Sequence, residues 1–564
     1  MKQQIEQAIA RCVVDMVAEE QTAPSVRLSR PKQQAHGDFA CNIAMQLART
    51  LRQPPAAIAG QIIERCAWPA AVRKVEVAGP GFINIFLADT AEAGVLATIV
   101  RQGADYGRLP VDPARPRVMV EYVSANPTGP MHVGHCRGAC VGDALASLLA
   151  ARGHPVTREY YINDAGAQIE VLARSVWLRM RELQGEAISL PEDAYPGDYV
   201  IEIAREILQR HPFAELAAME EGARLELLGG QAVAANMARI RDDLAALGVR
   251  FDHYFSERQL HQSGAIRKLI EELTERGLVY RGTLPPPKGK EVADYRPVEQ
   301  LLFRTTDFGD TIDRPLCKQD GSATYFAADI AYHHDKFQRG FTRQIDVWGA
   351  DHGGYVARVQ AAVKAVCGLD GQPEVVLVQM VNLLRDGKPV KMSKRAGTFV
   401  TLREVVDEVG ADAVRFNFLT RRAESQLDFD LELARRQSEE NPVYYVQYAH
   451  ARAAAILRKA EEAGITSDDA ADTAPLTGSE ERRLIAMLTE YPTVLEQAAE
   501  RREPYRVATW LMELAAVWHR FYHKQRVVVE EQATAQARLL LVRATAQVLR
   551  NGLELLGVAA PERM

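Results

Sequence analysis

The sequence has no run of about 18 or more apolar residues, so we expect no transmembrane helix. Its first helix is amphipathic, with Ile5, Ile9, Cys12 and Met16 on one face, and has no signal-peptide core. The seven cysteines are scattered, with no C-x-x-C pair, which argues against a disulfide framework and a structural zinc site. We therefore expect a cytoplasmic protein with no membrane anchor.

An excess of positive charge is also missing. The formal net charge of -6 gives no global attraction to nucleic acid, so any RNA partner must be bound by local basic patches. Hydrophobic residues make up 47% and charged residues 25%, which is ordinary globular composition. A chain of 564 residues without internal repeats should form several domains, at roughly 150 residues per domain.

Three domains are predicted from the order of strand and helix patterns. Residues 1–108 read as a small α/β domain that ends in two strands around a Gly-Pro-Gly turn. Residues 109–402 read as a Rossmann-type, doubly wound parallel domain with helical insertions. Strand patterns vanish from 403 onward, so residues 403–564 are predicted to be an all-α bundle. The fold class is therefore multidomain α/β.

The middle domain opens with a strand-loop-helix-strand unit. "RPRVMVEYVSA" (115–125) is a nearly continuous run of β-forming residues, as in a buried parallel strand. A helix with its glycine cap at Gly153 follows, and "HPVTREYYI" (154–162) is a second strand. Further strands are expected near residue 250 and in "DVWGADHGGY" and "PEVVLVQMVNLL", after a mostly helical stretch (165–248) and a proline-rich loop, "RGTLPPPKGKE".

The loop between the first strand and its helix carries "NPTGPMHVGH" (126–135), and we call residues 132–135 the histidine motif. A helix amino terminus offers unpaired N–H groups and the positive end of a dipole, which suits a phosphate. His132 and His135 can donate hydrogen bonds to a triphosphate, and Gly134 leaves room for close approach because it has no Cβ. Taken alone, the pattern is weak, and two satisfied loop or core histidines would explain it better.

A second motif, "GKPVKMSKRAG" (387–397), places Lys391 and Lys394 around Met392 and Ser393, between glycines. This spacing suggests a mobile loop that brings two ammonium groups onto a polyphosphate. We call residues 391–394 the lysine motif. A lone lysine run is more often a solvated surface, so the interpretation depends on both motifs together.

The two motifs resemble the HIGH and KMSK signatures of class I aminoacyl-tRNA synthetases, with valine in place of isoleucine in the first. "EYVSANPTGPMHVGH", "TYFAADIAYHHDKF", "WGADHGGYVARV" and the terminal "LGVAAPERM" are similar to arginyl-tRNA synthetases, and the resemblance covers essentially the whole chain. It implies an ATP-dependent arginine-tRNA ligase that forms arginyl-adenylate and transfers arginine to its tRNA. Alternatives are another class I synthetase, a nucleotidyltransferase or a non-catalytic RNA-binding paralogue.

The resemblance also implies the roles of the ATP-binding residues. His132 and His135 would contact the ATP phosphates, Gly134 the adenosine, and Lys391 and Lys394 the departing pyrophosphate. Met392 and Ser393 complete the ATP site. Magnesium would arrive with ATP, and no protein metal site is expected. We expect a monomer.

The arginine site is assigned in the same way. A guanidinium pairs best with carboxylates, and the resemblance implies that Glu121 and Asp329 hold it. Four further positions are assigned to arginine on the same basis: Ser124, Asn126, Tyr325 and His352. In isolation, Tyr325 and Asp329 would be read as an ordinary surface pair on a helix.

The RNA-binding surfaces remain open from the sequence alone. The resemblance assigns the helical bundle to the anticodon and the first domain to the outer corner of the tRNA. Tyr444, Tyr445 and Tyr448 can stack on bases or equally pack in a core, and Arg27, Arg30 and Lys32 can bind phosphate or form a solvated loop. Cys136 and Cys140, one helical turn apart, are interpreted as small buried helix residues, since two thiols are only half a metal site.

Overall fold

The computed structural model of the chain describes residues 2–17, 24–29, 31, 36–87, 94–284, 298–318, 320–390, 400–466 and 469–564. The chain divides into two compact units. The first comprises Met1–Ala104, Ala453–Glu490 and Val517–Val548, and the second Asp105–Arg452, Tyr491–Ala516 and Leu549–Met564. Four long helices contribute residues to both units: α17 (Pro442–Glu462), α18 (Ser479–Arg501), α19 (Tyr505–Lys524) and α20 (Gln532–Leu555).

The amino-terminal part of the first unit is a small antiparallel sheet with helices. Its strand order is β1-β2-β4-β3, and Ile5, Ile9, Ile62 and Ile85 are among the buried residues of its core. The elements are α1 (Lys2–Val14), β1 (Leu28–Ser29), β2 (Phe39–Cys41), α2 (Ile43–Leu51), α3 (Pro55–Arg65), β3 (Val72–Ala78), β4 (Phe82–Leu87), α4 (Gly94–Gln102) and η2 (Gly103–Asp105). The predicted pair of strands around the Gly-Pro-Gly turn is confirmed as β3 and β4.

A five-stranded parallel sheet organises the second unit. Its order is β12-β11-β5-β6-β7, and all four pairings are parallel. The strands are β5 (Val118–Glu121), β6 (Val156–Ile162), β7 (His253–Ser256), β11 (Arg343–Gly349) and β12 (Glu374–Val378). Chain order therefore runs outward in both directions from β5 and β11, which is the doubly wound arrangement of a Rossmann-type fold. The predicted fold class is confirmed.

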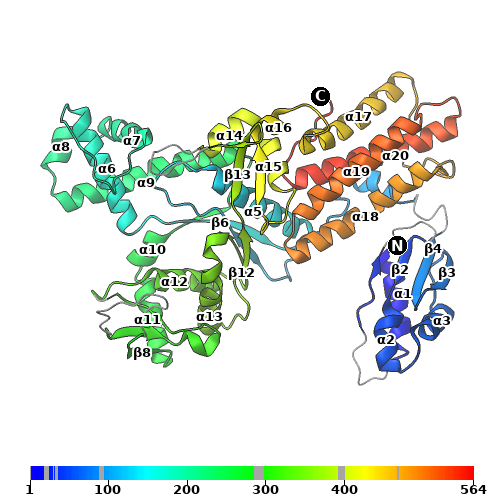
Figure 1. Cartoon of the computed structure of the whole chain (residues 1–564), viewed down its shortest axis with the longest axis horizontal. Coiled ribbons are helices and arrows are strands. Elements are labelled where there is room, and N and C mark those ends of the chain that lie inside the picture. The colour runs from blue at the N-terminus through cyan, green and yellow to red at the C-terminus, as the bar shows by residue number, and fades with distance from the viewer. Residues whose placement is uncertain are drawn as a thin grey trace. The chain divides into compact units, whose positions relative to one another are not determined.

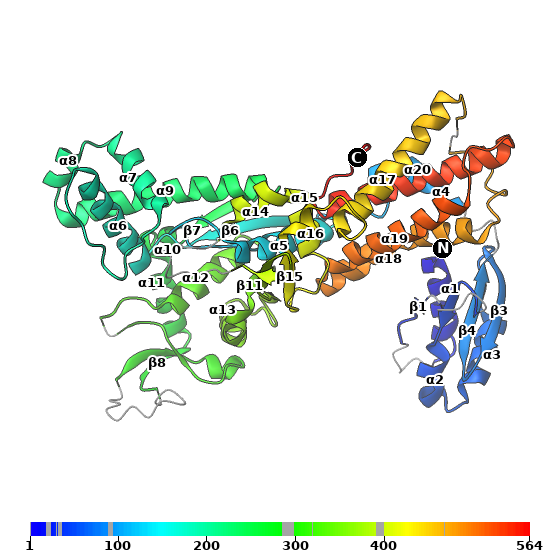
Figure 2. The ribbon, with the colours of Figure 1, turned by 45° about the horizontal axis from the view of Figure 1, so that its top comes forward.

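Helices and small sheets surround this sheet. A cluster of four helices is inserted between β6 and β7, and its longest helix, α9, runs back to α14 (Figures 1 and 2). The helices are α5 (Val133–Ala151), α6 (Ala167–Leu183), α7 (Asp198–Leu208), α8 (Phe213–Ala218), α9 (Glu221–Ala246), α10 (Glu257–Gln262), α11 (Ala265–Glu275), α12 (Tyr325–Gln338), α13 (Val356–Cys367), α14 (Leu402–Val409), α15 (Ala411–Phe418) and α16 (Leu431–Arg435), with η3 (Thr305–Phe308) and η4 (Ala350–Tyr355). The predicted helical stretch 165–248 is thus confirmed. The proline-rich loop lies largely outside the described residues.

The prediction that strands end before residue 403 is wrong. β15 (Leu427–Asp430) pairs in parallel with β13 (Val381–Arg385), and β14 (Lys388–Pro389) completes this small sheet. A separate small sheet contains β8 (Val279–Gly282), β9 (Gln300–Phe303) and β10 (Arg314–Pro315). β15 escaped detection because four residues between helices give too short an alternation to recognise.

Helix α5 packs tightly against the sheet along most of its length. Gly142 faces the ring of Tyr122, and a Cβ on this glycine would lie 2.3 Å from Tyr122 Cγ. Asp143 accepts a hydrogen bond from the buried Arg415 of α15 at 2.5 Å. Arg415 also donates to the carbonyl oxygen of Leu556 at 2.9 Å, so one guanidinium joins α15, α5 and the end of α20.

The cysteines behave as small apolar residues. All seven are free, and Cys136 and Cys140 are buried in α5, which confirms their interpretation. Burial raises the pKa of both thiols. Within the described residues, no group of three or more His, Cys, Asp or Glu side chains could hold a metal ion. No helix in that same part of the chain is long and apolar enough to cross a membrane.

The close contact between Gly142 and Tyr122 predicts opposite effects for two alanine substitutions in α5. Gly142→Ala should lower the free energy of unfolding by about 1–3 kcal/mol, because the new methyl group overpacks a buried ring. Gly138→Ala is the matched control, since a Cβ there meets nothing within 4 Å, and it should raise stability by about 1 kcal/mol through helix propensity. Urea unfolding followed by circular dichroism measures both. Equal effects at the two positions would contradict the packing.

Candidate active site

The candidate site lies at the carboxyl ends of β5 and β11, which are neighbours in the parallel sheet. The chain leaves these two strands toward opposite sides of the sheet, so this edge contains the topological switch point where such folds bind ligands. The histidine motif follows β5 directly and begins α5. Sequence and topology therefore place it at the expected edge.

A strained turn separates β5 from the histidine motif. Val123 and Ser124 have positive φ angles of 67° and 41°, a costly conformation for residues with a side chain, above all for a β-branched one. The Ser124 N–H donates to the Tyr122 carbonyl at 2.9 Å, as in a γ-turn. The turn brings the Ser124 hydroxyl under the carboxylate of Glu121, to which it donates at 2.9 Å.

The histidine motif is organised by its own backbone. His132 is the N-cap of α5, and its Nδ1 accepts from the Gly134 N–H at 3.1 Å. The Nδ1 of His135 accepts from the His132 N–H at 3.3 Å, and the two rings stack with centroids 3.9 Å apart. Because each Nδ1 is an acceptor, the proton of each neutral ring is on Nε2, which makes Nε2 a hydrogen-bond donor.

Gly134 has a structural role inside this arrangement. A Cβ at this position would lie 2.8 Å from the Cε1 and Nδ1 atoms of the His132 ring. The missing Cβ makes room for the neighbouring imidazole, and the predicted contact of Gly134 with the adenosine stays a prediction. Any larger residue here would displace the ring of His132.

The lysine motif falls outside the described residues, so Lys391, Met392, Ser393 and Lys394 are not placed. The chain just after it is placed. The Val133 N–H donates to the Val400 carbonyl at 3.2 Å, and the Leu402 N–H donates to the Met131 carbonyl at 2.8 Å. The segment that follows the lysine motif is thus hydrogen-bonded directly to the histidine motif.

Three carboxylates lie in register across adjacent strands of the sheet. Glu159 of β6 pairs with Glu121 of β5, and Glu121 pairs with Asp346 of β11. Lys336 of α12 is completely buried and donates to Glu121 at 2.6 Å and to Asp346 at 3.0 Å. Arg339 forms two bonds to Glu159, at 2.6 and 2.9 Å. We call the three acids the carboxylate row.

The carboxylate row changes how Glu121 can act. Its two oxygens already accept hydrogen bonds from Lys336 and Ser124. Burial by itself would lower the pKa of Lys336, but the charges of Asp346, Glu121 and Glu159 outweigh this effect, so the pKa of Lys336 is raised. Asp346 is different, because burial dominates and raises its pKa to about 7.

Asp329 forms a second acidic centre, on the same helix as Lys336. It accepts a hydrogen bond from the Tyr355 hydroxyl at 2.6 Å. Burial raises its pKa to about 7, and the charges of Glu257 and Glu121 add to that rise. Glu257, the first residue of α10, is itself buried and its pKa is also raised by burial. Tyr161 is close enough to interact electrostatically with Glu257, Asp329 and Glu121.

The remaining predicted residues are more exposed. Tyr325 is the first residue of α12 and 61% exposed, and its hydroxyl lies near Gly166 at the start of α6. Asn126 is exposed and donates to Gln168 at 2.9 Å. His352 is exposed, and its ring lies 6.4 Å from that of Trp348, which in turn lies 6.2 Å from the Tyr355 ring. One chain of contacts thus runs from His352 through the rings of Trp348 and Tyr355 to Asp329.

Sequence reasoning missed the partners that set the charge of this site. Lys336 could have been found, because it lies two helical turns after Asp329 on the same face of α12. No sequence pattern identified Glu257 as a site residue, because its position depends on where the inserted helices α6 to α9 bring the chain back to the sheet at β7. The pairing of Glu159 with Glu121 likewise depends on strand register, which a single sequence does not specify.

The buried lysine predicts a pH-dependent loss of stability. Lys336→Met should lower the free energy of unfolding by about 3–5 kcal/mol near pH 8, because Glu121 and Asp346 are left without their cation. The uncompensated acids then have raised pKa values in the folded state, so the loss should shrink as the pH falls toward 5.5 and they become protonated. Urea unfolding at both pH values measures this.

Lys364→Met is the matched control, because Lys364 is a half-exposed lysine whose partner, Asp370, is on the surface. It should change stability by at most about 0.5 kcal/mol at either pH. A loss in Lys336→Met that is the same at pH 5.5 and pH 8 would show that the ion pairs are not its cause.

Comparison with known proteins gives a consistent result. Three family models match: "Arginyl tRNA synthetase N terminal domain" over residues 1–87, "tRNA synthetases class I (R), catalytic domain" over 98–192, and "DALR anticodon binding domain" over 446–564. The arginine–tRNA ligase of Magnetococcus marinus is 47% identical over 576 residues, covering 100% of both chains. That of Xanthobacter autotrophicus is 50% identical over 99% of this chain and 98% of its own.

A solved structure agrees with these relatives. The Thermus thermophilus arginyl-tRNA synthetase superposes with a TM-score of 0.77 at 25% identity, covering 100% of both chains. The chain therefore belongs to the arginyl-tRNA synthetase family of class I aminoacyl-tRNA synthetases.

Proposed function

We propose that the protein is an arginine–tRNA ligase that activates L-arginine with ATP and transfers it to the terminal adenosine of its tRNA. The observation that carries this proposal is the pair of Nε2–H donors at the start of α5, together with the acidic centre at Asp329, whose charge interacts with that of Glu121 at the end of β5. Family membership supports it over the whole chain. The first step is attack of the arginine carboxylate on the α-phosphorus, with pyrophosphate leaving.

The ATP side needs charge neutralisation more than a nucleophile. His132 and His135 would donate from Nε2 to the phosphates, helped by the amino-terminal end of the α5 dipole. Lys391 and Lys394 would stabilise the departing pyrophosphate. Lys394 precedes Val400 by six positions, and Val400 is bonded to the histidine motif, so chain length allows this approach. Magnesium would enter bound to ATP, and Met392, Ser393 and Gly134 would complete the site.

The arginine-binding pocket would be lined by acidic side chains, and without arginine Asp329 would be partly protonated near neutral pH. Asp329 would pair with the guanidinium, and Glu257 would add a second acid that the sequence did not suggest. Glu121 would act mainly by its field, since both its oxygens have partners, with Ser124 orienting it. Tyr325 and His352 would border the pocket, and Asn126 would bind the α-amino or carboxyl group of arginine.

The tRNA would be bound by surfaces outside this edge. We assign the helical region that matches the anticodon-binding model to the anticodon, and the first domain to the outer corner of the tRNA. Tyr444 and Tyr448 are half-buried and stack with ring centroids 5.8 Å apart, so they remain candidates for base stacking. Arg27 is exposed, whereas Arg30 and Lys32 lie outside the described residues. We further propose a cytoplasmic monomer, with domains at 1–108, 109–402 and 403–564.

Arginine-dependent exchange between pyrophosphate and ATP, tested across the twenty amino acids with and without tRNA, decides between the enzyme and its rivals. We expect exchange with arginine alone among them. Exchange with another amino acid would favour another class I synthetase, and no exchange at all would favour a non-catalytic paralogue.

Lys394→Ala should slow adenylate formation about a hundredfold with little effect on arginine affinity. Lys388→Ala, which changes an exposed lysine of β14, should leave the rate of adenylate formation unchanged.

The raised pKa of Asp329 predicts the pH dependence of arginine binding. Because its pKa is about 7 in the empty site, the carboxyl must lose its proton to pair with the guanidinium. Arginine affinity should be constant above about pH 8 and fall up to tenfold per pH unit below 7. Calorimetric titration from pH 6 to 8.5 measures it. Asp329→Asn should bind weakly with a flat profile, and an unchanged slope would assign the titration to another group.

A further inference from the structure

A cavity of about 300 Å³ lies at the amino-terminal edge of the parallel sheet, the edge opposite the candidate active site. Arg115 precedes β5, Arg152 and His154 lie between α5 and β6, and Arg343 begins β11. Arg502 closes the cavity from the turn between α18 and α19. All of these residues belong to the second compact unit. We call this the arginine cavity.

Positive charge exceeds negative charge in the lining of the arginine cavity. Four guanidinium groups and one imidazole line the cavity together with two carboxylates, Glu496 and Glu500, while Asp112, outside the lining, lies 3.8 Å from Arg115. Arg152 approaches Glu496 no closer than 3.7 Å, at a carboxylate that is half exposed. Such a pair contributes little, because solvent screens it. The lining therefore has more cations than its own acids neutralise.

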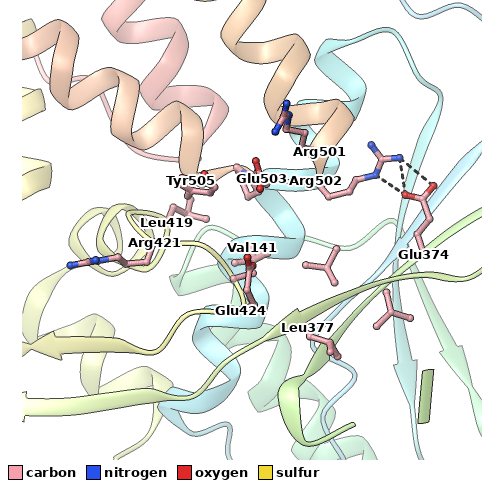
Figure 3. A pocket seen from close by; sticks show the side chains of 14 residues that line it. Val141, Glu374, Leu377, Leu419, Arg421, Glu424, Arg501, Arg502, Glu503 and Tyr505 are labelled. Atoms are coloured by element: carbon pink, nitrogen blue, oxygen red, sulfur yellow. Dashed lines mark hydrogen bonds and ion pairs between the residues drawn. The ribbon is translucent and has the colours of Figure 1, made fainter. Parts of the chain in front are cut away.

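Two of these cations are held in place by one further acid. Arg343 and Arg502 both donate to Glu374 of β12, at 3.1 and 2.9 Å. Figure 3 shows Arg502 reaching from the end of α18 to Glu374, beside an adjacent cavity of about 370 Å³ that it also lines. Arg502 has a φ angle of 59°, which is a strained backbone conformation for a residue with a side chain.

Burial and the neighbouring positive charges disfavour the charged forms of several side chains that line the cavity. Burial lowers the pKa of Arg152, where Glu496 opposes the effect and Arg115 adds to it. Burial likewise lowers the pKa of Arg502, where Glu374 opposes the effect and Arg343 adds to it. Burial also lowers the pKa of His154, with all four arginines adding to the effect. Its Nδ1 atom is buried and has no hydrogen-bond partner among the residues that the structure describes. An anion in the cavity would relieve each of these costs.

The shape and chemistry of the lining identify the class of anion. Guanidinium groups match the oxygens of a phosphate group with paired hydrogen bonds. Leu109, Leu149 and Ala499 form apolar walls, which strengthen electrostatic interactions by excluding water. A volume of about 300 Å³ accepts a phosphate group with a small substituent and excludes a folded macromolecule.

We propose that the arginine cavity is a binding site for one phosphate group, held by Arg115, Arg152, Arg343 and Arg502 with a hydrogen bond to His154. The group can come from a free phosphate or from the end or backbone of the tRNA, and the chemistry of recognition is the same. Binding would tie the α18–α19 turn to β6 and β11. The phosphate site is separate from the proposed active site, so this proposal does not depend on the proposed ligase activity.

The imidazole of His154 provides a local probe for the test. We would follow its ring signal by NMR in the full-length protein labelled with carbon-13 histidine, assigning it with His154→Gln. Inorganic phosphate should shift this signal and raise the measured pKa of His154 by roughly one. Because the signal is local, phosphate bound at the histidine motif would be seen separately.

Variants of the cavity arginines complete the experiment. Arg343→Gln should weaken the phosphate effect about tenfold, and Arg115→Gln, which changes a more exposed lining residue, tests the same point if the first variant fails to fold. Arg267→Gln, a highly exposed arginine of α11, is the matched control and should behave as wild type.

The outcomes separate the two sources of phosphate. A shift with inorganic phosphate that the cavity variants weaken supports a small-anion site. A shift with tRNA at stoichiometric concentration, and none with inorganic phosphate, supports the RNA backbone as the source. No shift with either, or an equal shift in wild type, Arg343→Gln and Arg115→Gln, would overturn the proposal.

Discussion

The active edge of the sheet depends on one buried ammonium group. Glu159, Glu121 and Asp346 lie side by side on adjacent strands, and carboxylates at that spacing repel one another strongly away from water. Lys336 bonds to two of them from the last turn of α12. Because Asp329 is on the same helix, the ion pair that neutralises the carboxylate row also positions the acid proposed to bind arginine. The stability of this edge and the proposed specificity for arginine thus depend on the same contact.

Helix α5 connects the candidate ATP site to distant parts of the chain. Its first turn holds the two stacked imidazoles. Further along, the buried Arg137 donates to the carbonyl oxygens of Gln379, Ser425 and Arg422, and Asp143 accepts from Arg415. The position of the imidazoles is therefore determined by segments far along the sequence, including the end of α20, whose Leu556 carbonyl is bonded to Arg415.

The two edges of the parallel sheet have opposite chemistry. The carboxyl edge gathers acids and suits a guanidinium, whereas the amino edge gathers arginines and suits an anion. Strand β11 has both, with Arg343 at its start and Asp346 at its middle, level with the last residue of β5. A parallel sheet makes this separation simple, because every strand presents its two ends to the same two edges.

The sequence by itself determined the Rossmann-type fold, the strands of the five-stranded sheet and the place of the histidine motif, because apolar runs, glycine caps and short motifs are local signals. It also showed that Tyr325 and Asp329 share one face if their segment is a helix, and α12 is that helix. Only the tertiary structure decided that Gly134 makes room for His132, that Glu121 already has Lys336 as its cation, and that Glu257 joins Asp329. The same holds for β15 and for the arginine cavity. These features depend on strand register and on how distant segments pack, and no local pattern in one sequence encodes either.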